Sequence, residues 1–453
     1  METVLNKIIE SKKKWVFAKK RTFPLDIFKN DIVKSDRDFN ESLTSSQAVF
    51  ILECKKGSPS KGLIRKKFNL NEITSVYKNY ANVISVLTDE EFFMGSFANL
   101  SIVRKNVSQP ILCKDFIIDE YQVYLARHYG ADAILLMLSV LSDAEYVKLT
   151  KVAYKLGMGV LTEASNEKEV QRAINLKAKV VGINNRNLRD LSVDLNTTRL
   201  LAPKLPKGVI VISESGIGSN KDIRDLRKYA DGFLIGSSIM SERNIELAVR
   251  KMVYGFNKVC GLTSVENAQK AYNSGAVFGG FIFVPESPRY IDMAKAKTIR
   301  NKVRFNYVGV FKNHDIKDIV DHAYALKLAA VQLHGNENQE YIDTLKSKLH
   351  KNCQIWNAYG VKTRIPVFMK NVDYHLLDTK IGVQTGGTGK KFDWTLIEDT
   401  KKIILAGGIG PSNVSEAIKI DCSALDLNSG VEYKTGEKSY KKLQEVFNEI
   451  RNY

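Results

Sequence analysis

Short apolar runs recur along the chain, and each is followed by a polar or glycine-containing break and then by a segment with helical spacing. Helices are predicted over Glu167–Ala178 and Asp222–Tyr229, for example. Strands that are continuous apolar runs and alternate with helices are typical of a parallel sheet covered by helices. Eight runs between Ala48 and Ser237 predict a (β/α)8 barrel: AVFILE, NVISVL, PILC, ADAILLML, GMGVLTE, AKVVGIN, GVIVISE and DGFLIGS.

The second half of the chain repeats this pattern between Lys258 and Asn428. Its eight runs are KVCGLT, FGGFIFV, NYVGVF, AAVQLHG, QIWNAY, DYHLLD, KIILAGG and CSALDLN. We therefore expect an α/β protein of two tandem (β/α)8 TIM barrels. The competing fold, one open doubly wound sheet, would need all sixteen strands and lacks a GxGxxG sequence after its first strand, which argues against it.

The limits of the two barrels follow from the segments around them. Val4, Leu5, Ile8 and Ile9 lie on one side of a predicted amphipathic helix, which makes an N-terminal helical extension. A helix predicted over residues 244–254 closes the first barrel. The predicted domains are therefore residues 1–255 and 256–453, and a chain of 453 residues is long enough for two cores.

The cysteines and histidines exclude several classes of site. The five cysteines are odd in number and contain no CxxC pair, and the six histidines show no HExxH spacing. We expect no disulfide framework, no metal and a reducing cytoplasm. The N-terminal segment has no apolar signal core and carries Glu2 and Glu10, so we expect no secretory signal.

The net charge of +18 raises the question of nucleic-acid binding. Lysines are spread along the whole chain in short clusters such as Lys12–Lys14, and no binding motif accompanies them. We therefore expect no nucleic-acid partner, and small anionic substrates as the ligands. The apolar runs are too short to span a bilayer, so no membrane association is expected.

Polar side chains follow the apolar runs of the first barrel, where the active sites of such barrels lie. Lysines and glutamates that converge in an apolar barrel mouth shift each other's pKa and can perform acid–base chemistry. Two neighbours of these residues, Cys54 and Cys113, should point outward, because adjacent strand residues face opposite sides. The candidates are Glu53, Lys55, Lys114, Glu163, Asn184, Arg186, Glu214 and Ser215.

Glycines follow the seventh and eighth strands of both predicted barrels, where barrels commonly bind phosphate with backbone N–H groups. In the first barrel they lie in SESGIG and LIGSS, with Gly216, Gly236 and Ser237 as candidates. A glycine at one such position could serve only a turn, but the recurrence in both barrels favours phosphate binding. The corresponding residues of the second barrel are Gly407, Gly408, Asn428, Ser429 and Gly430.

The remaining strand ends of the second barrel carry Cys260, Arg289, His334 and Asp378. Cys260 and Asp378 would approach the barrel mouth from opposite sides, which suits an acid and a base in a proton-transfer isomerisation. Cys260 could equally be a buried small apolar residue. The segment GGTGK, which begins at Gly386, lacks the full phosphate-loop spacing, so it predicts no nucleotide site.

These motifs resemble two known families. The segments FILECKKGSPSKG, ILCKDF, VLTE, VGINNRNL and VISESGI are similar to indole-3-glycerol-phosphate synthases. The segments KVCGLT, FVPESPR, VQLHGNE, LLDT, GGTGKKFDW, LAGGI and LDLNSGVE resemble N-(5′-phosphoribosyl)anthranilate isomerases. Together the motifs cover nearly the whole chain, and their order resembles bifunctional tryptophan-biosynthesis proteins of bacteria.

The resemblance implies an Amadori rearrangement of phosphoribosylanthranilate in the second barrel. Asp378 would protonate the ribose ring oxygen, and Cys260, as thiolate, would take the proton from C2′. Arg289 would hold the substrate carboxylate. The other implied substrate- or phosphate-binding residues are His334, Gly386, Gly407, Gly408, Asn428, Ser429 and Gly430.

The resemblance also implies that the first barrel closes the rearranged product into indole-3-glycerol phosphate, with loss of carbon dioxide and water. Lys114 would be the general acid in ring closure, and Glu163 the acid and base of the dehydration. No cofactor is implied. The supporting residues would be Glu53, Lys55, Asn184, Glu214 and Ser215 around the reacting atoms, and Ser58, Arg186, Gly216, Gly236 and Ser237 around the substrate and its phosphate.

Two alternatives remain. Phosphosugar epimerases and the Amadori isomerase of histidine biosynthesis use a similar barrel and phosphate site, but the latter would have a carboxylate where this chain has Cys260. A basic scaffold protein would leave the polar strand ends unexplained. Two barrels bury enough core for a monomer, which is the oligomeric state we expect.

Overall fold

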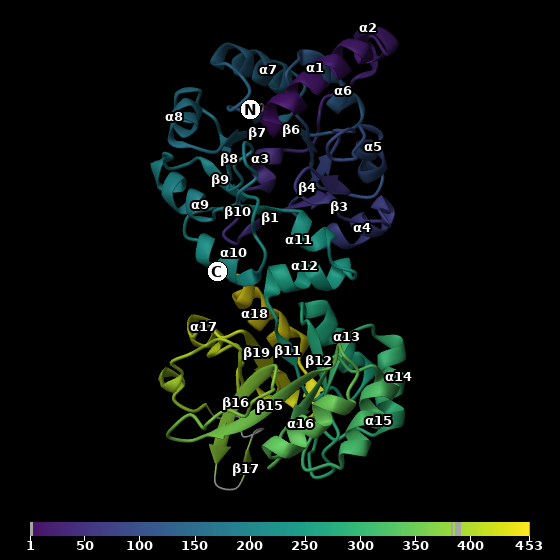
Figure 1. Ribbon diagram of the computed structural model, residues 1–453, viewed down its shortest axis with the longest axis vertical. Coiled ribbons are helices and arrows are strands. Elements are labelled where there is room, and N and C mark those ends of the chain that lie inside the picture. The colour runs from purple at the N-terminus through teal and green to yellow at the C-terminus, as the bar shows by residue number, and fades with distance from the viewer. Residues whose placement is uncertain (1–2, 382–383, 386–390, 453) are drawn as a thin grey trace. The chain divides into compact units, whose positions relative to one another are not determined.

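The computed structural model describes residues 3–381, 384–385 and 391–452, and it divides into two compact units (Figure 1). The first unit extends to Met252 and the second begins at Val253. This division falls within helix α12 (Ile245–Tyr254), whereas the predicted limits place it just after that helix.

The first unit contains the predicted closed parallel barrel, in the order β1-β10-β9-β8-β7-β6-β5-β4, with β4 pairing back to β1. The eight strands predicted from the apolar runs are all present. Nearly every strand residue is buried, because the strands are covered on both sides. Their bounds are β1 Val49–Cys54, β4 Val83–Leu87, β5 Ile111–Lys114, β6 Ala133–Met137, β7 Gly159–Ala164, β8 Val180–Asn184, β9 Ile210–Glu214 and β10 Gly232–Ile235.

Helices surround this barrel (Figure 1), and several begin with side-chain caps. Ser142 and Glu145 form a reciprocal capping box at the start of α7, as do Asp119 and Gln122 at α6. The helices predicted to end at residues 178 and 229 end three residues earlier; after α8, Lys177 adopts a left-handed φ of 55°. The bounds are α1 Val4–Thr22, α2 Leu25–Phe28, α3 Phe39–Ser42, α4 Leu70–Tyr77, α5 Ala98–Arg104, α6 Glu120–His128, α7 Asp143–Lys155, α8 Glu167–Asn175, α9 Asn196–Leu201, α10 Asn220–Leu226 and α11 Ser237–Met240.

The predicted N-terminal amphipathic helix is α1, and it packs its apolar face against the barrel core through Val4, Leu5, Ile8 and Ile9. One lysine of this helix is buried instead of facing solvent. Lys12 is buried, and its Nζ lies 2.7 Å from a carboxylate oxygen of both Asp89 and Asp115, which follow β4 and β5. A single ammonium therefore ties α1 to the C-terminal ends of two barrel strands.

Replacing Lys12 by methionine should lower the free energy of unfolding by about 3–5 kcal/mol, because it leaves two buried carboxylates without their cation. Urea unfolding followed by circular dichroism measures this change. Lys13→Met is the matched control, since Lys13 is exposed and forms an ion pair with Glu10 on the same helix; its stability should equal that of the wild type. Equal stability of the two variants would contradict the prediction.

The second unit is also a closed parallel barrel, in the order β15-β14-β13-β12-β11-β19-β18-β16, closed by pairing of β15 with β16. All eight runs predicted there are strands. The sequence patterns did not predict three short antiparallel additions, β17, β20 and β21. The bounds are β11 Lys258–Val259, β12 Phe278–Ile282, β13 Asn306–Phe311, β14 Ala330–Leu333, β15 Gln354–Val361, β16 Tyr374–Ile381, β17 Gln384–Thr385, β18 Ile403–Leu405, β19 Ala424–Leu427, β20 Glu432–Lys434 and β21 Glu437–Lys438.

The helices of the second unit lie around its barrel (Figure 1) and enclose one large apolar core between the sheet and the helices. Alternate strand residues contribute to that core, so the residues between them face the barrel interior. Val259, for example, belongs to the outer core, whereas Cys260 packs with Ile282 and Val310 in a separate inner cluster. The helices are α13 Val265–Ser274, α14 Met293–Lys302, α15 Ile316–Leu326, α16 Gln339–Lys348, α17 Val414–Lys419 and α18 Tyr440–Arg451.

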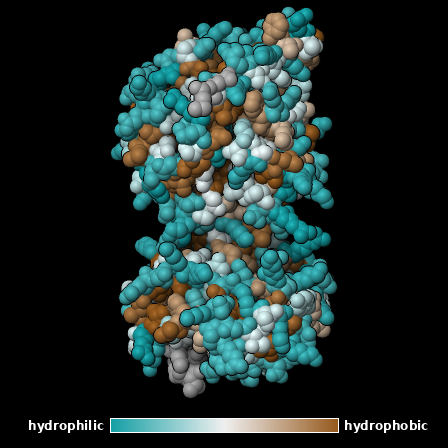
Figure 2. Space-filling view, in the orientation of Figure 1, coloured by the Kyte–Doolittle hydropathy of each residue, from teal (hydrophilic) through white to brown (hydrophobic). Residues whose placement is uncertain are grey.

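Hydrophilic residues prevail on the face drawn in Figure 2, and apolar residues lie between them in smaller groups. None of the helices in the described part of the chain has the length and apolarity needed to cross a membrane.

Candidate active sites

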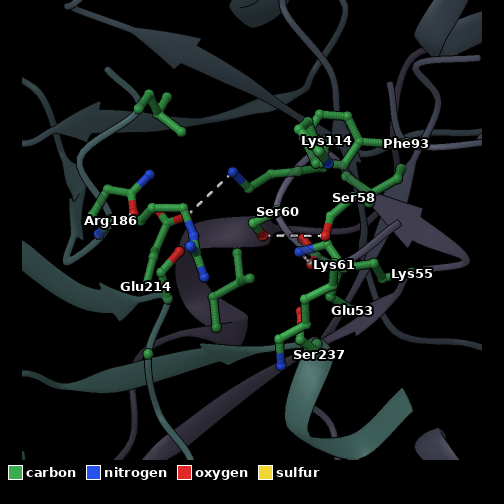
Figure 3. Close-up of a pocket in the computed structure, with 18 of the residues that line it drawn as sticks. Glu53, Lys55, Ser58, Ser60, Lys61, Phe93, Lys114, Arg186, Glu214 and Ser237 are labelled. Carbon is green, nitrogen blue, oxygen red and sulfur yellow. Dashed lines mark hydrogen bonds and ion pairs between the residues drawn. The ribbon is translucent and has the colours of Figure 1, made fainter. Parts of the chain in front are cut away.

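A cavity lies at the C-terminal ends of the first barrel's strands, and it brings together residues from distant parts of the sequence (Figure 3). All twelve residues proposed for this barrel line it. Apolar side chains that the motifs did not single out complete its wall, among them Ile8, Phe93, Leu135 and Leu188. The cavity thus combines acid–base groups with a surface suited to an aromatic ring. The twelve are Glu53, Lys55, Ser58, Lys114, Glu163, Asn184, Arg186, Glu214, Ser215, Gly216, Gly236 and Ser237.

Lys114, at the end of β5, is the centre of the charged network in this cavity. Its Nζ lies 3.1 Å from Glu163 Oε2 and 3.3 Å from Glu214 Oε2. The other oxygen of Glu163 accepts a hydrogen bond of 3.0 Å from Asn184 Nδ2. In Figure 3, Lys114 extends toward the side of the cavity where Glu214 and Arg186 lie. One ammonium thus bridges two carboxylates from β7 and β9.

Burial and charge act in opposite directions on these groups. Burial alone would lower the pKa of Lys114, but the carboxylates of Glu214, Glu163 and Glu53 raise it above its ordinary value. Burial raises the pKa of Glu214 to about 7, although Lys114 opposes that rise. Lys114 therefore stays a charged proton donor at neutral pH, while Glu214 titrates in that range.

Glu214 has an incomplete set of partners. Its Oε1 is buried and has no hydrogen-bond partner among the described residues. The space for this oxygen comes from Gly182 on β8, where an added Cβ would lie 1.8 Å from it. An unpaired buried acceptor in a cavity is costly unless a ligand donates to it. Gly182 was not a sequence candidate. Its position inside the apolar strand run AKVVGIN could have indicated a close approach of another group to the backbone.

Glu53 and Lys55 form the second pair in this cavity, with 2.7 Å between Glu53 Oε1 and Lys55 Nζ. Burial would raise the pKa of Glu53, but Lys55 and Lys114 hold it below the ordinary value. The Lys55 ammonium lies 5.9 Å from the ring centre of Phe93. Ser58, on the short strand β2 (Gly57–Ser58), lies on the same side of the cavity as this pair (Figure 3).

The two cysteines expected to face away from the cavity are both buried. Cys54 interacts with Tyr77 of α4, and Cys113 contacts Thr88. Neither cysteine lines the cavity.

The end of the cavity where the sequence predicted phosphate binding is formed by the residues after β9 and β10. Ser215 and Gly216 have left-handed φ values of 66° and 81°, which turn the chain directly after Glu214. Gly236 and Ser237 lead into α11, and an added Cβ at Gly236 would lie 2.5 Å from Glu53 Oε1. Asn185 stabilises this turn: its Nδ2 donates to the carbonyl oxygens of Glu214 and Ser215 at 3.0 and 3.1 Å.

Asn185 itself was missed by sequence reasoning. It is buried, it follows β8, and its side-chain oxygen accepts from both the N–H and the hydroxyl of Thr198. The sequence VGINN shows a second asparagine directly after Asn184. Because adjacent strand positions face opposite sides, this pattern gave no reason to place both asparagines in the site.

In the second barrel, Cys260 directly follows β11 and Asp378 lies on β16, three strands away in the ring. Both side chains are buried and face the barrel interior, since their neighbours Val259 and Leu377 belong to the outer core. Burial raises the pKa of Asp378 to about 6. It also raises the pKa of Cys260 above its ordinary value, despite the nearby Lys258 charge.

Arg289 is held by the protein rather than pointing freely into the barrel mouth. Its guanidinium makes bonds of 2.9 and 2.7 Å to the two oxygens of Glu432, and Lys438 Nζ lies 2.7 Å from Glu432 as well. Lys438 also donates to Asn428 Oδ1 at 2.9 Å. This buried cluster connects the loop after β12 with the residues after β19, and Glu432 and Lys438 were not sequence candidates.

The glycine-containing loops after β18 and β19 lie against each other. An added Cβ at Gly430 would lie 2.1 Å from the carbonyl oxygen of Ile409, so this approach requires glycine. Gly407 and Gly408 have φ values of 101° and 66°. Asn428 precedes the short 3-10 helix that begins at Ser429, next to Gly430. The two phosphate-loop segments of the prediction are therefore neighbours.

His334 follows β14, and its Nδ1 lies 3.3 Å from Gln332 Nε2. Gly386 lies outside the described residues. No group of three or more His, Cys, Asp or Glu side chains is arranged to hold a metal ion in the part of the chain that is described.

Two protein families match the two units of the fold, and their matches meet near the boundary between the units. A sequence model of indole-3-glycerol phosphate synthase matches residues 5–252, and one of N-(5′-phosphoribosyl)anthranilate isomerase matches residues 257–449. A phosphoribosylanthranilate isomerase structure from Thermotoga maritima is 33% identical, covers 43% of this chain and 98% of its own, and gives a TM-score of 0.38.

Relatives with both parts extend over the whole chain. The tryptophan biosynthesis protein TrpCF of Vibrio parahaemolyticus is 56% identical over 100% of this chain and 95% of its own length. The protein of the same name from Vibrio cholerae is 53% identical over 100% and 97%. The chain therefore belongs to the bifunctional tryptophan-biosynthesis enzymes that join an indole-3-glycerol phosphate synthase to an N-(5′-phosphoribosyl)anthranilate isomerase.

Proposed function

We propose that the cavity of the first barrel performs the synthase reaction with Lys114 as the general acid of ring closure. Its ammonium is positioned by Glu163 and Glu214 and protonates the C2′ oxygen as the aromatic carbon attacks. Glu163, oriented by Asn184, then transfers the protons of the dehydration. The observation that carries this assignment is the pair of ion contacts between Lys114 and these two carboxylates.

The other polar residues of the cavity hold the substrate in this proposal. Lys55 pairs with the substrate's anionic groups, and Glu53 orients Lys55. The apolar wall, including Phe93 and Leu135, receives the aromatic ring and favours the release of neutral carbon dioxide. The turn at Ser215 and Gly216, together with Gly236 and Ser237, offers backbone N–H groups to the phosphate. Ser58 and Arg186 complete the substrate contacts.

In the second barrel we assign the general acid to Asp378 and the base to Cys260. A carboxyl whose pKa is about 6 can donate a proton to the ribose ring oxygen near neutral pH. The Cys260 thiolate then takes the proton from C2′. The loops at Gly407–Gly408 and Asn428–Gly430 bind the phosphate, and Gly386 and His334 complete the substrate contacts. Arg289, oriented by Glu432, binds the anthranilate carboxylate.

The wider properties follow from the same chemistry. Both substrates are small phosphorylated anions, so the excess of lysine and arginine attracts them, and no nucleic acid, membrane or cofactor is needed. We place the domain limits at residues 1–255 and 256–453. The enzyme acts in the cytoplasm as a monomer.

The direct test is a steady-state assay of each half reaction on the purified chain. Phosphoribosylanthranilate should be converted to the rearranged product and then to indole-3-glycerol phosphate, without added metal or cofactor and with EDTA present. The ribosylamine substrate of histidine biosynthesis, offered at the same concentration, should give no turnover above background. Turnover of that compound at a comparable kcat/KM would contradict the assignment of Cys260 as the specific base.

A further inference from the structure

A lysine that no step above uses is buried in the interior of the second barrel. Lys258, on β11, is fully buried, and it is two residues before Cys260, so both side chains face the same side of the strand. A fully buried lysine is rare unless its charge has partners. The partners of Lys258 therefore indicate what this charge does in the barrel.

The ammonium of Lys258 carries three protons, and two of the described side chains accept hydrogen bonds from it. Its Nζ lies 2.7 Å from Asp426 Oδ2 on β19 and 2.7 Å from Gln332 Oε1 on β14. The sulfur of Cys260 is the third group beside this ammonium, because both side chains pass over Gly280, and the Lys258 charge favours the thiolate of Cys260. Because an ammonium has only donors, it pairs better with a thiolate than with a neutral thiol.

The backbone of β12 is shaped to allow this contact. An added Cβ at Gly280 would lie 2.7 Å from Cys260 Sγ and 2.8 Å from Lys258 Cε. Both side chains therefore pass over the same glycine, and any larger residue there would force them apart. The ammonium also lies 5.9 Å from the ring centre of Trp356, and the lysine side chain has no contact with solvent.

We propose that Lys258 is a positioning residue of the isomerase, which holds Cys260 in its thiolate form, and that Asp426 limits the strength of this effect. The proposal rests on the assignment of Cys260 as the base. Among the described residues, four charged groups act on the sulfur: Lys258 and Lys438 favour the thiolate, Asp426 opposes it, and Arg289 also interacts with it. Of these charges, Lys258 has the largest influence on the thiol.

The reaction needs this support because of the order in which the two groups titrate. It requires Asp378 protonated and Cys260 ionised at the same time, yet Asp378 has a pKa of about 6 and burial raises that of Cys260 above its usual value. The productive form is then the minor one of the two singly protonated forms, and its share falls tenfold for each further unit between the two pKa values. A cation beside the sulfur recovers part of that loss.

The test measures the ionisation of Cys260 directly. The rate of carboxamidomethylation by iodoacetamide, followed at the Cys260 peptide by mass spectrometry, is recorded against pH, and the other four cysteines are resolved as separate peptides. In Lys258→Met the midpoint should move upward by about 1 pH unit or more. The descending limb of the isomerase kcat/KM profile should move upward with it, and the plateau below it should fall.

Replacing Asp426 should shift the midpoint of Cys260 ionisation in the opposite direction. Asp426→Asn removes the carboxylate that opposes ionisation but keeps the ammonium, so the midpoint should move downward. Lys270→Met is the control, because Lys270 lies on α13 and pairs with Glu266 on the same helix; its curve should match the wild type. A purely structural Lys258–Asp426 pair would lower activity in both variants without moving the curves in opposite directions.

Folding is controlled with the double variant Lys258→Met/Asp426→Asn, which leaves no unpaired buried charge. Its near-ultraviolet circular dichroism should match the wild type, and its midpoint should lie above the wild-type value. The proposal is overturned if the midpoint is unchanged in the folded lysine variants, or if Asp426→Asn moves it upward. Isomerase activity that survives Cys260→Ala would instead refute the assignment of the base, and these two failures are distinct.

Discussion

Cys260→Ala and Asp378→Asn are each expected to lower the kcat of the isomerase by about 10²- to 10⁴-fold, because each removes one partner of the proton transfer. The synthase kcat in the same preparation should stay at the wild-type value, since its groups lie in the other barrel. The measurement is an assay of each half reaction with its own substrate. The synthase activity of the first barrel thus serves as an internal control for the loss of isomerase activity in the second barrel.

The matched control for Cys260→Ala is Cys353→Ala. Cys353 is a buried cysteine of the same barrel, but it belongs to the outer core between the sheet and the helices. Its replacement should cost some stability and leave the isomerase rate unchanged. If Cys260→Ala kept more than about a tenth of the wild-type kcat in a folded protein, the base would have to be another group.

Asp378→Asn carries its own test of folding, through the pH dependence of stability. Burial raises the folded-state pKa of Asp378 to about 6, above the ordinary 3.8. The ionised carboxylate therefore lowers the free energy of unfolding. This loss is absent below pH 3.8 and complete above pH 6. The variant should gain stability relative to the wild type between pH 5 and pH 8, so a loss of isomerase activity at pH 8 is not due to unfolding.

Lys114→Met should produce the reverse pattern, with loss of the synthase and a normal isomerase. The ammonium is the proton donor of the proposed ring closure, so kcat should fall by about 10²- to 10⁴-fold. Methionine preserves most of the volume of the side chain, and it leaves Glu163 and Glu214 without their common cation. Binding of the substrate's anionic groups should weaken as well, which would appear as a higher KM.

The lysine control is Lys148→Met, because Lys148 lies on the outer helix α7, is exposed, and forms an ion pair of 3.6 Å with Glu120. Both activities should be unaffected there. Loss of both activities in Lys114→Met, with circular dichroism unchanged, would contradict the assignment of two independent sites.

The positions of the strands and of the first barrel's site could be predicted because one signal determines both. A buried parallel strand is a continuous apolar run, and the first polar residue after it must lie at the barrel mouth. Glu53, Lys114 and Glu214 were found in this way, far apart in sequence and together in the cavity. The hydroxyl of Ser58 was included only through its motif.

The rest of the site depends on partners that a single sequence does not identify. Lys12 has the pattern of a surface lysine, and only the fold brings Asp89 and Asp115 to it. In the same way, Arg289 could be recognised as a functional cation, whereas its bond to Glu432 joins residues that are far apart in the chain. Pairing between distant charges is a tertiary property, so neither apolar spacing nor motif length indicates it.

Gly236 illustrates how a residue without a side chain can affect chemistry as well as binding. The space above it is filled by Glu53, which in turn contacts Lys55. Any substitution at Gly236 would displace that carboxylate while also reshaping the loop proposed for the phosphate. In a mutational scan, substitutions of this glycine would therefore change kcat and KM together, as substitutions of an acid–base residue do. Neither constant alone would show that the glycine itself transfers no proton.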